Sequence, residues 1–125
     1  MNDSSRNMHR KSNPDFLNGV PELVVLGLLA RRPMYGYEIV QAIAAESGGV
    51  LSFGEGCIYP LLHKLEERGD LASRRMKVGG RSRVVYHVTP TGGQRAAESA
   101  AAWKAIVQAI GHILQGGRHE RAKIA

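Results

Sequence analysis

The chain has 125 residues, which is enough for one domain with one continuous core. Its 17 Lys and Arg residues against 11 Asp and Glu residues give a formal net charge of +6, which favours an acidic partner such as nucleic acid or a membrane surface. Cys57 is the only cysteine, so an intramolecular disulfide is excluded, and no apolar run is long enough for a membrane span or resembles a secretion signal. We therefore expect a cytoplasmic protein with no membrane partner.

The first elements in chain order are a polar arm and a buried helix. Residues 1–16 are rich in Asn, Ser, Arg and Lys and show no periodicity, so we expect a disordered N-terminal arm. Pro21 and Glu22 suit the first turn of a helix, and residues 23–30 are apolar on nearly every side. This pattern predicts a helix that is buried in the core.

A second helix follows a short interruption. Residues 31–33, Arg-Arg-Pro, end the first helix, and residues 36–46 resume a helical pattern with Ile39, Val40 and Ile43 facing inward. We interpret Gly36 as the residue of a tight turn between the two helices. Residues 48–54 contain three glycines and predict a loop, with or without a short strand.

The third helix is short and amphipathic. Its apolar residues fall at positions i, i+3, i+4 and i+7, and they are Ile58, Leu61, Leu62 and Leu65. Gly56, Pro60 and His63 point to the opposite side. Because proline deep inside a helix breaks backbone hydrogen bonds, Pro60 places the start of this helix at about residues 55–57.

A basic hairpin follows the third helix. Residues 71–77 and 83–88 are strand-like, and Gly79-Gly80 forms the turn between them. Five of the 17 basic residues lie here with no acidic residue among them: Arg74, Arg75, Lys77, Arg81 and Arg83. This clustering predicts a basic patch and not a uniformly charged surface.

The last helix carries an apolar seam. Thr89-Pro90 supplies an N-cap and a first-turn proline, and the helix is predicted to run to about Leu114. Its seam has heptad-like spacing and consists of Ala96, Ala100, Trp103, Val107, Ile110 and Leu114, widened by Ile106 and Ile113. A small domain does not leave such a stripe uncovered, so we expect a second copy of the chain to cover it. Residues 116–125 form a short basic tail that we expect to be frayed.

The order of three helices, strand, basic turn, strand and helix is that of a winged helix-turn-helix fold, mainly α with a small β-hairpin. Three motifs carry a family resemblance: Met34-Tyr35-Gly36-Tyr37-Glu38-Ile39, the run from Gly56 to Gly69 around Tyr59-Pro60, and the run from Gly80 to Gly92 with Arg81, Arg83, Tyr86 and Thr89. Together they resemble the PadR family of bacterial transcriptional regulators, in its short subgroup with one C-terminal helix. The resemblance implies a homodimeric repressor that binds a palindromic operator, often near detoxification or efflux genes, and is released by a small molecule.

This interpretation divides the chain into an arm, a DNA-binding domain at residues 17–90, a dimerisation helix at residues 91–115 and the tail. In the third helix, Tyr59, His63 and Lys64 are predicted to contact phosphates and base edges, and Gly56 allows close approach to DNA. His63 is as readily an ordinary exposed residue, and the Tyr59 ring could pack in the core with only its hydroxyl outside. Cys57 stands where the family usually has Ser or Thr, which puts one hydroxyl contact in doubt.

The wing and two aromatic residues complete the predicted sites. Gly80, Arg81 and Arg83 are expected to follow the DNA backbone or enter the minor groove. Tyr37 could donate to a phosphate or to a neighbouring helix, and for Tyr35 packing is an equally good interpretation. Trp103 is either a large anchor of the dimer seam or, in addition, a platform for a flat aromatic or apolar effector.

Enzymatic chemistry is not predicted. The sequence has no Cys/His metal spacing, nucleophile elbow or phosphate-binding glycine motif, so we expect no metal and no cofactor. The alternative to a DNA-binding regulator is a winged helix that serves as a protein-interaction or ligand-binding module, with a hairpin that is basic only for solubility or for an acidic protein.

Overall fold

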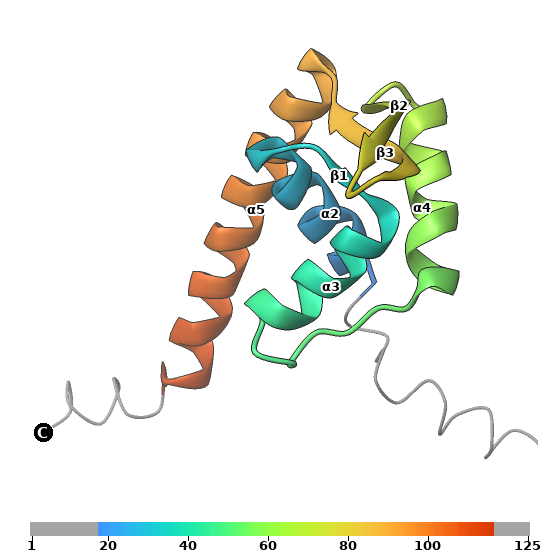
Figure 1. Cartoon of the computed structure of the whole chain (residues 1–125). Helices are drawn as coiled ribbons and strands as arrows, with labels where there is room; N and C mark the ends of the chain where they lie inside the picture. The colour runs from blue at the N-terminus through green and yellow to red at the C-terminus, as the bar shows by residue number, and fades with distance from the viewer. Residues whose placement is uncertain (1–17, 117–125) are drawn as a thin grey trace, which may run out of the picture.

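The computed structural model describes residues 18–116, with four helices and three strands in this part of the chain (Figure 1). The elements, labelled as in Figure 1, are α2 (Val20–Arg31), β1 (Met34–Tyr35), α3 (Gly36–Glu46), α4 (Glu55–Glu67), β2 (Leu71–Val78), β3 (Arg81–Val88) and α5 (Pro90–Leu114). Within these residues, none of the helices is both long enough and apolar enough to cross a bilayer. The predicted disordered arm (1–16) and most of the predicted tail (117–125) lie outside the described residues.

The core is formed where α2, α3 and α4 meet the sheet. The predicted burial of α2 is confirmed, because Val25, Leu26 and Leu29 are almost completely inaccessible to solvent. From α4, the expected apolar face is buried through Ile58, Leu62 and Leu65, while Leu61 is only half-buried. The inward face predicted for α3 is also confirmed, with Ile39 and Ile43 buried, while Val40 is partly buried against the core.

The sheet has three antiparallel strands in the order β1-β3-β2. The hairpin of β2 and β3 is longer than predicted, with pairing from Leu71 opposite Val88 to Val78 opposite Arg81. Gly79 and Gly80 both have positive φ angles, +61° and +80°, as a tight hairpin turn requires. The edge strand β1 was not predicted, since two residues are too few to show an alternating pattern.

Helix α4 begins at Glu55, as predicted, after a loop that contains no strand. Pro60 lies in the second turn of α4, past the first turn where a missing N–H costs nothing, so it removes one backbone hydrogen bond, and the helix nevertheless continues to Glu67. Helix α4 runs beside the hairpin (Figure 1) and contacts β2, where the Ser73 hydroxyl donates to Glu66 Oε2 at 2.7 Å. The amphipathic helix and the basic wing are therefore neighbours in space.

Helix α5 is fixed to the domain most tightly at its beginning and also packs along α2. Thr89 caps it, because its side-chain oxygen accepts from the Gly92 N–H at 3.0 Å. The first two turns pack against the domain through Gly92 and Ala96, which are buried, whereas every residue from Ala100 to Ile110 is exposed. The helix crosses one side of the molecule (Figure 1), and the large apolar residues of its second half are exposed.

Candidate nucleic-acid interface

The solvent-facing side of α4 carries the small and polar residues that the sequence predicted there. Gly56, Pro60, His63 and Lys64 are all exposed, so none of them is needed for the core of the monomer. A helix whose first turns expose a glycine and a proline, followed by two donors, allows a close approach of a groove or backbone. His63 is thus an exposed residue, and its contact with DNA stays a prediction.

Tyr59 does not face solvent in the same way, because its ring packs on the backbone of Gly36 at the start of α3. A Cβ atom built on Gly36 would lie 2.7 Å from Cζ and 2.8 Å from the hydroxyl oxygen of Tyr59. Gly36 is the first residue of α3 and has no positive φ angle, so its interpretation as a tight-turn residue is wrong. Only glycine leaves room for the aromatic ring, and the Tyr59–Gly36 contact holds α4 against α3.

Cys57 lies one turn into α4 and is half-buried against the core. Burial raises the pKa of its thiol, which keeps it in the unreactive protonated form. The side chain therefore contributes packing where a hydroxyl would contribute a donor.

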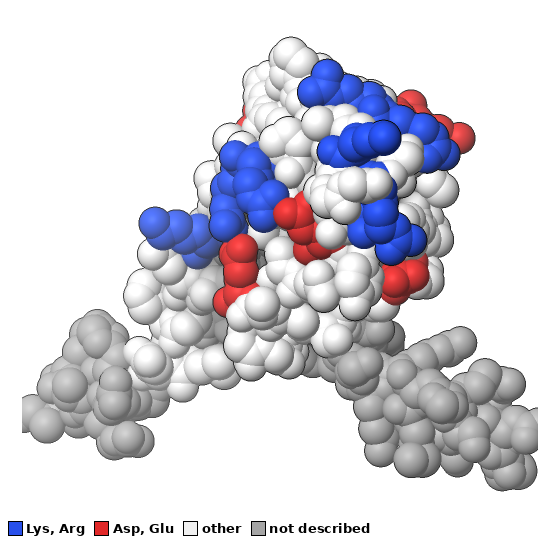
Figure 2. Space-filling model, viewed as in Figure 1, with Lys and Arg blue, Asp and Glu red and all other residues white. Residues whose placement is uncertain are grey.

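The basic residues of the hairpin divide between its two faces. Residues paired across antiparallel strands project to the same side, and Arg75 and Lys77 are paired with Val84 and Ser82, on the face that also carries the buried Tyr86. This is the face that meets α4. In Figure 2, Lys and Arg side chains gather at the upper right, where Figure 1 places the hairpin, with acidic side chains at the edge of the group, and basic and acidic side chains are mixed across the middle of the view. The register therefore places Arg75 and Lys77 on the same face as α4, and both are candidate DNA contacts.

Arg81 and Arg83 lie on the opposite face of the hairpin and differ in environment. Arg81 is exposed beside the turn, whereas Arg83 is half-buried with its guanidinium carbon 4.3 Å from the centre of the Tyr35 ring. A cation above an aromatic face is held by the ring quadrupole, so Tyr35 fixes the direction of the Arg83 side chain. Tyr35 has the packing role, while Tyr37 is 45% exposed and free to donate.

A long apolar stripe follows the unpartnered part of α5. Trp103 is 42% exposed and Ile106, Val107 and Ile110 are about half exposed, with Ile113 and Leu114 more so. Ala96, the first residue of the predicted seam, is instead buried in the core of the monomer. The exposed part of the stripe therefore begins near Ala100.

A hollow of about 330 Å³ lies between the start of α2 and the middle of α5. Its lining includes Trp103, Ile106 and Ala102 from α5, and Val20, Glu22 and Leu23 from α2. Trp103 therefore belongs to the apolar stripe and also lines this open hollow.

The family pattern for PadR-like transcriptional regulators matches residues 25–98, from the first helix through the wing to the start of α5. The chain belongs to the PadR-like family. A transcriptional regulator of Mycobacterium tuberculosis is 30% identical over 105 residues, which cover 84% of this chain and 92% of that protein. Among solved structures, a PadR-like regulator of Bacillus cereus has a TM-score of 0.74 at 25% identity, and the match covers 82% of this chain and 98% of that protein's chain. A PadR family regulator of Eggerthella lenta has a TM-score of 0.68 at 28% identity, with 91% and 95% covered.

Family membership and fold together identify a DNA-binding transcriptional regulator with a winged helix-turn-helix, and not an enzyme. The alternative of a protein-interaction module without DNA binding is disfavoured, because the family and the relatives named above are regulators. The structure also gives a physical role to several residues of the PadR motifs. Gly36 and Tyr59 make one contact, Tyr86 is core, and Thr89 caps α5.

Proposed function

We propose that this PadR-like regulator is a homodimeric repressor that binds a palindromic operator and is released by a small molecule. The observation that supports it best is the uncovered apolar stripe of α5 on a domain that presents a helix beside a basic wing. Pairing of two α5 helices duplicates α4 about a twofold axis, and two such helices fit major grooves about 34 Å apart. A symmetric dimer then requires a palindromic site.

In this proposal the wing supplies affinity and α4 supplies sequence preference. Arg75, Lys77, Arg81 and Arg83 contact phosphates or the minor groove, and each contact adds about 0.9 to the salt slope of binding. His63 and Lys64 reach base edges, with Gly56, Cys57 and Gly80 at the points of close approach, and Tyr37 and Tyr59 offer hydroxyls to phosphates.

The test begins with the DNA fragments that the purified protein selects from its own genome. Fluorescence polarisation with the selected duplex should show weaker binding and a salt slope reduced by about 2 for the Arg81→Ala, Arg83→Ala double variant. Arg31→Gln is the matched control, since Arg31 is an exposed arginine engaged with Glu46 away from the wing. Equal affinity of the double variant and the parent would refute the role of the wing.

Substitution in α4 should have a different signature. His63→Ala or Lys64→Ala is expected to change which base pairs are preferred at defined positions of the half-site, with a smaller loss on non-specific duplex. A uniform loss over all sequences would reduce these residues to phosphate contacts.

Dimerisation is tested separately from DNA binding. Ile110→Glu places a charge in the middle of the stripe and should convert the dimer to monomer in sedimentation velocity, because burial of an unpaired carboxylate opposes association. Gln108→Glu introduces the same charge at an exposed position on the other side of α5 and should leave the dimer intact. A dimer that survives Ile110→Glu would exclude this stripe as the interface.

Release by an effector is proposed for the hollow beside Trp103. Flat aromatic compounds should quench the fluorescence of this tryptophan and lower operator affinity over the same concentration range. Quenching without loss of operator binding would leave Trp103 as an anchor of the dimer only.

A further inference from the structure

A completely buried carboxylate lies where α4, β2 and α5 meet. Asp70 follows the end of α4 and has no exposed surface, and it is the only charged side chain that is buried among residues 18–116. Burial raises the pKa of its carboxyl, but hydrogen bonds and charges from Arg68 and Arg95 outweigh this effect and lower the pKa. The group is thus an ionised side chain held between two arginines.

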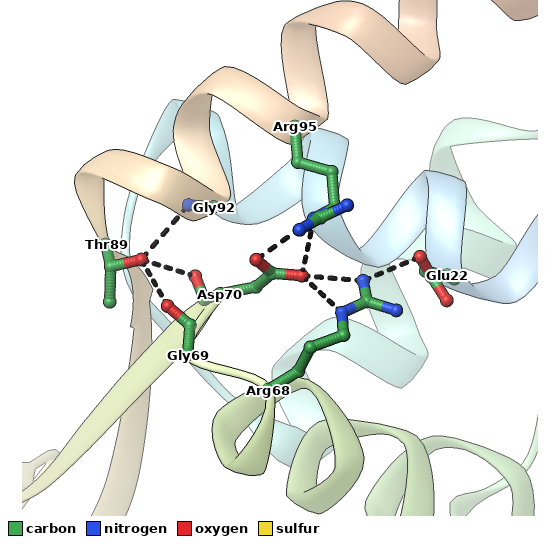
Figure 3. A network of polar contacts seen from close by, with 7 residues as sticks. All are labelled: Glu22, Arg68, Gly69, Asp70, Thr89, Gly92 and Arg95. Atoms are coloured by element: carbon green, nitrogen blue, oxygen red, sulfur yellow. Dashed lines mark hydrogen bonds and ion pairs between the residues drawn. The ribbon is translucent and has the colours of Figure 1, made fainter.

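The arginines come from different elements (Figure 3). Arg68, at the end of α4, donates from Nε to Asp70 Oδ2 at 2.7 Å and contacts Glu22 of α2 through Nη2 at 2.8 Å. Arg95 of α5 donates from Nε to Asp70 Oδ1 at 3.1 Å, and the same nitrogen forms an ion pair with Oδ2 at 3.0 Å. A single carboxylate therefore joins the end of the DNA-reading helix to the start of the dimerisation helix.

The backbone reinforces this joint. The Thr89 hydroxyl donates to the Gly69 carbonyl at 2.7 Å, and the Thr89 N–H donates to the Asp70 carbonyl at 3.0 Å. Gly92 packs so closely on Asp70 that a Cβ atom would overlap its carbonyl oxygen. The first turn of α5 is thus fixed on Asp70 by side chain and main chain together.

The position of this joint gives it leverage. Helix α5 has 25 residues, about 37 Å, and its uncovered stripe occupies the part farthest from Asp70. A rotation of about 10° at the first turn displaces the far end by about 6 Å, since the rise is about 1.5 Å per residue. That displacement exceeds the separation of about 3.4 Å between successive base pairs.

We propose that Asp70 and Arg95 are positioning residues that set the angle between α4 and α5, and hence the half-site spacing that the dimer accepts. This inference rests on the proposed function, because it requires a dimer that reads two half-sites. Neither residue needs to touch DNA.

The experiment uses labelled duplexes that carry the operator selected by the parent protein. Binding to this operator is compared with binding to operators that have one base pair inserted or deleted between the half-sites. The measured quantity is the ratio of dissociation constants for altered and original spacing. Arg95→Gln should lower this ratio at least threefold, and Asp70→Asn should lower it further. Arg95 is 45% exposed, so Arg95→Gln is expected to fold even if Asp70→Asn does not.

Arg31→Gln is the matched control, because it removes one positive charge from an arginine–carboxylate pair of 2.7 Å that joins α2 to α3. The loss of charge cancels in the ratio, so Arg31→Gln should keep the spacing preference of the parent. A lower thermal midpoint for Arg95→Gln with an unchanged ratio would show that the cluster is only structural and would overturn the proposal. A parent protein that selects no duplex would overturn the proposed function as well.

Discussion

Gly92→Ala is expected to destabilise the fold strongly, because the start of α5 leaves no space for a methyl group. The added Cβ would overlap the Asp70 carbonyl oxygen and lie 2.7 Å from the carbonyl carbon. The obstacle is backbone, so the first turn of α5 has to shift, and the Thr89 N–H bond to Asp70 and the Thr89 cap lengthen with it. Overpacking costs about 1–3 kcal/mol, and a hydrogen bond or cap about 1 kcal/mol. We expect the free energy of unfolding to fall by about 3 kcal/mol or more.

Gly93→Ala is the control for this prediction, since it adds the same methyl group at the next residue. Its Cβ would meet Val88 Cγ2 at 3.8 Å, an ordinary contact, and alanine favours a helix by about 0.5–1 kcal/mol over glycine. The two substitutions should therefore have opposite signs in urea unfolding followed by circular dichroism. Both must be measured at one protein concentration, because the proposed dimerisation would add to the apparent stability. Equal effects at the two positions would refute the close packing of α5 on Asp70.

Three further predictions concern other contacts. Gly36→Ala should destabilise the parent and the Tyr59→Phe variant by about 1–2 kcal/mol in urea unfolding, because the ring of residue 59 obstructs the added methyl group. The same substitution should not destabilise the Tyr59→Ala variant, which has no ring. An equal loss of stability in all three backgrounds would contradict the contact between Gly36 and Tyr59. Tyr35→Leu should weaken duplex binding about two- to fivefold in fluorescence polarisation, because about 0.5–1 kcal/mol of cation–π stabilisation of Arg83 is lost. Tyr35→Phe keeps the ring and should bind like the parent, and equal binding by the leucine variant would show that the stack is irrelevant to DNA. Asp70→Asn should have a lower free energy of unfolding than the parent at pH 7. This difference should narrow as pH falls below about 4, because the lowered pKa stabilises the fold only while Asp70 is ionised. A difference that is independent of pH in urea unfolding would argue against an ionised Asp70.

The elements with strong periodicity were predictable from the sequence. The apolar spacing of α4, the capped start of α5 at Pro90 and the glycine turn of the hairpin each depend on residues close in sequence. Strand β1 escaped prediction because Met34 and Tyr35 become a strand only by pairing with Tyr86 and Val85. A two-residue strand has no local pattern, and its existence depends on the tertiary fold.

The site residues were harder to interpret for the same reason. Gly36 suggested a tight turn, since a glycine that is needed for a turn and one that is needed for close approach look alike without the partner, here Tyr59. The burial of Asp70 was not predicted, because an aspartate after a glycine at a helix end is usually exposed. Its charge is paired in part with Arg95, which in the sequence is an ordinary polar residue of a helix. Long-range partners of this kind become visible only when the chain has folded.

The apolar periodicity of α5 includes residues of two different surfaces, one buried in the monomer and one exposed. Ala96 continues the spacing of the apolar seam but is buried by the domain, whereas Trp103 and Ile110 continue the same spacing on exposed helix. A seven-residue pattern predicts that one face of the helix is apolar, but it does not predict whether the same chain or another molecule covers that face. Because the first two turns are fixed on Asp70, the direction of the exposed stripe is set inside the monomer. Substitutions near Gly92 should therefore alter the geometry of the proposed dimer, while substitutions at Ile110 should alter its strength.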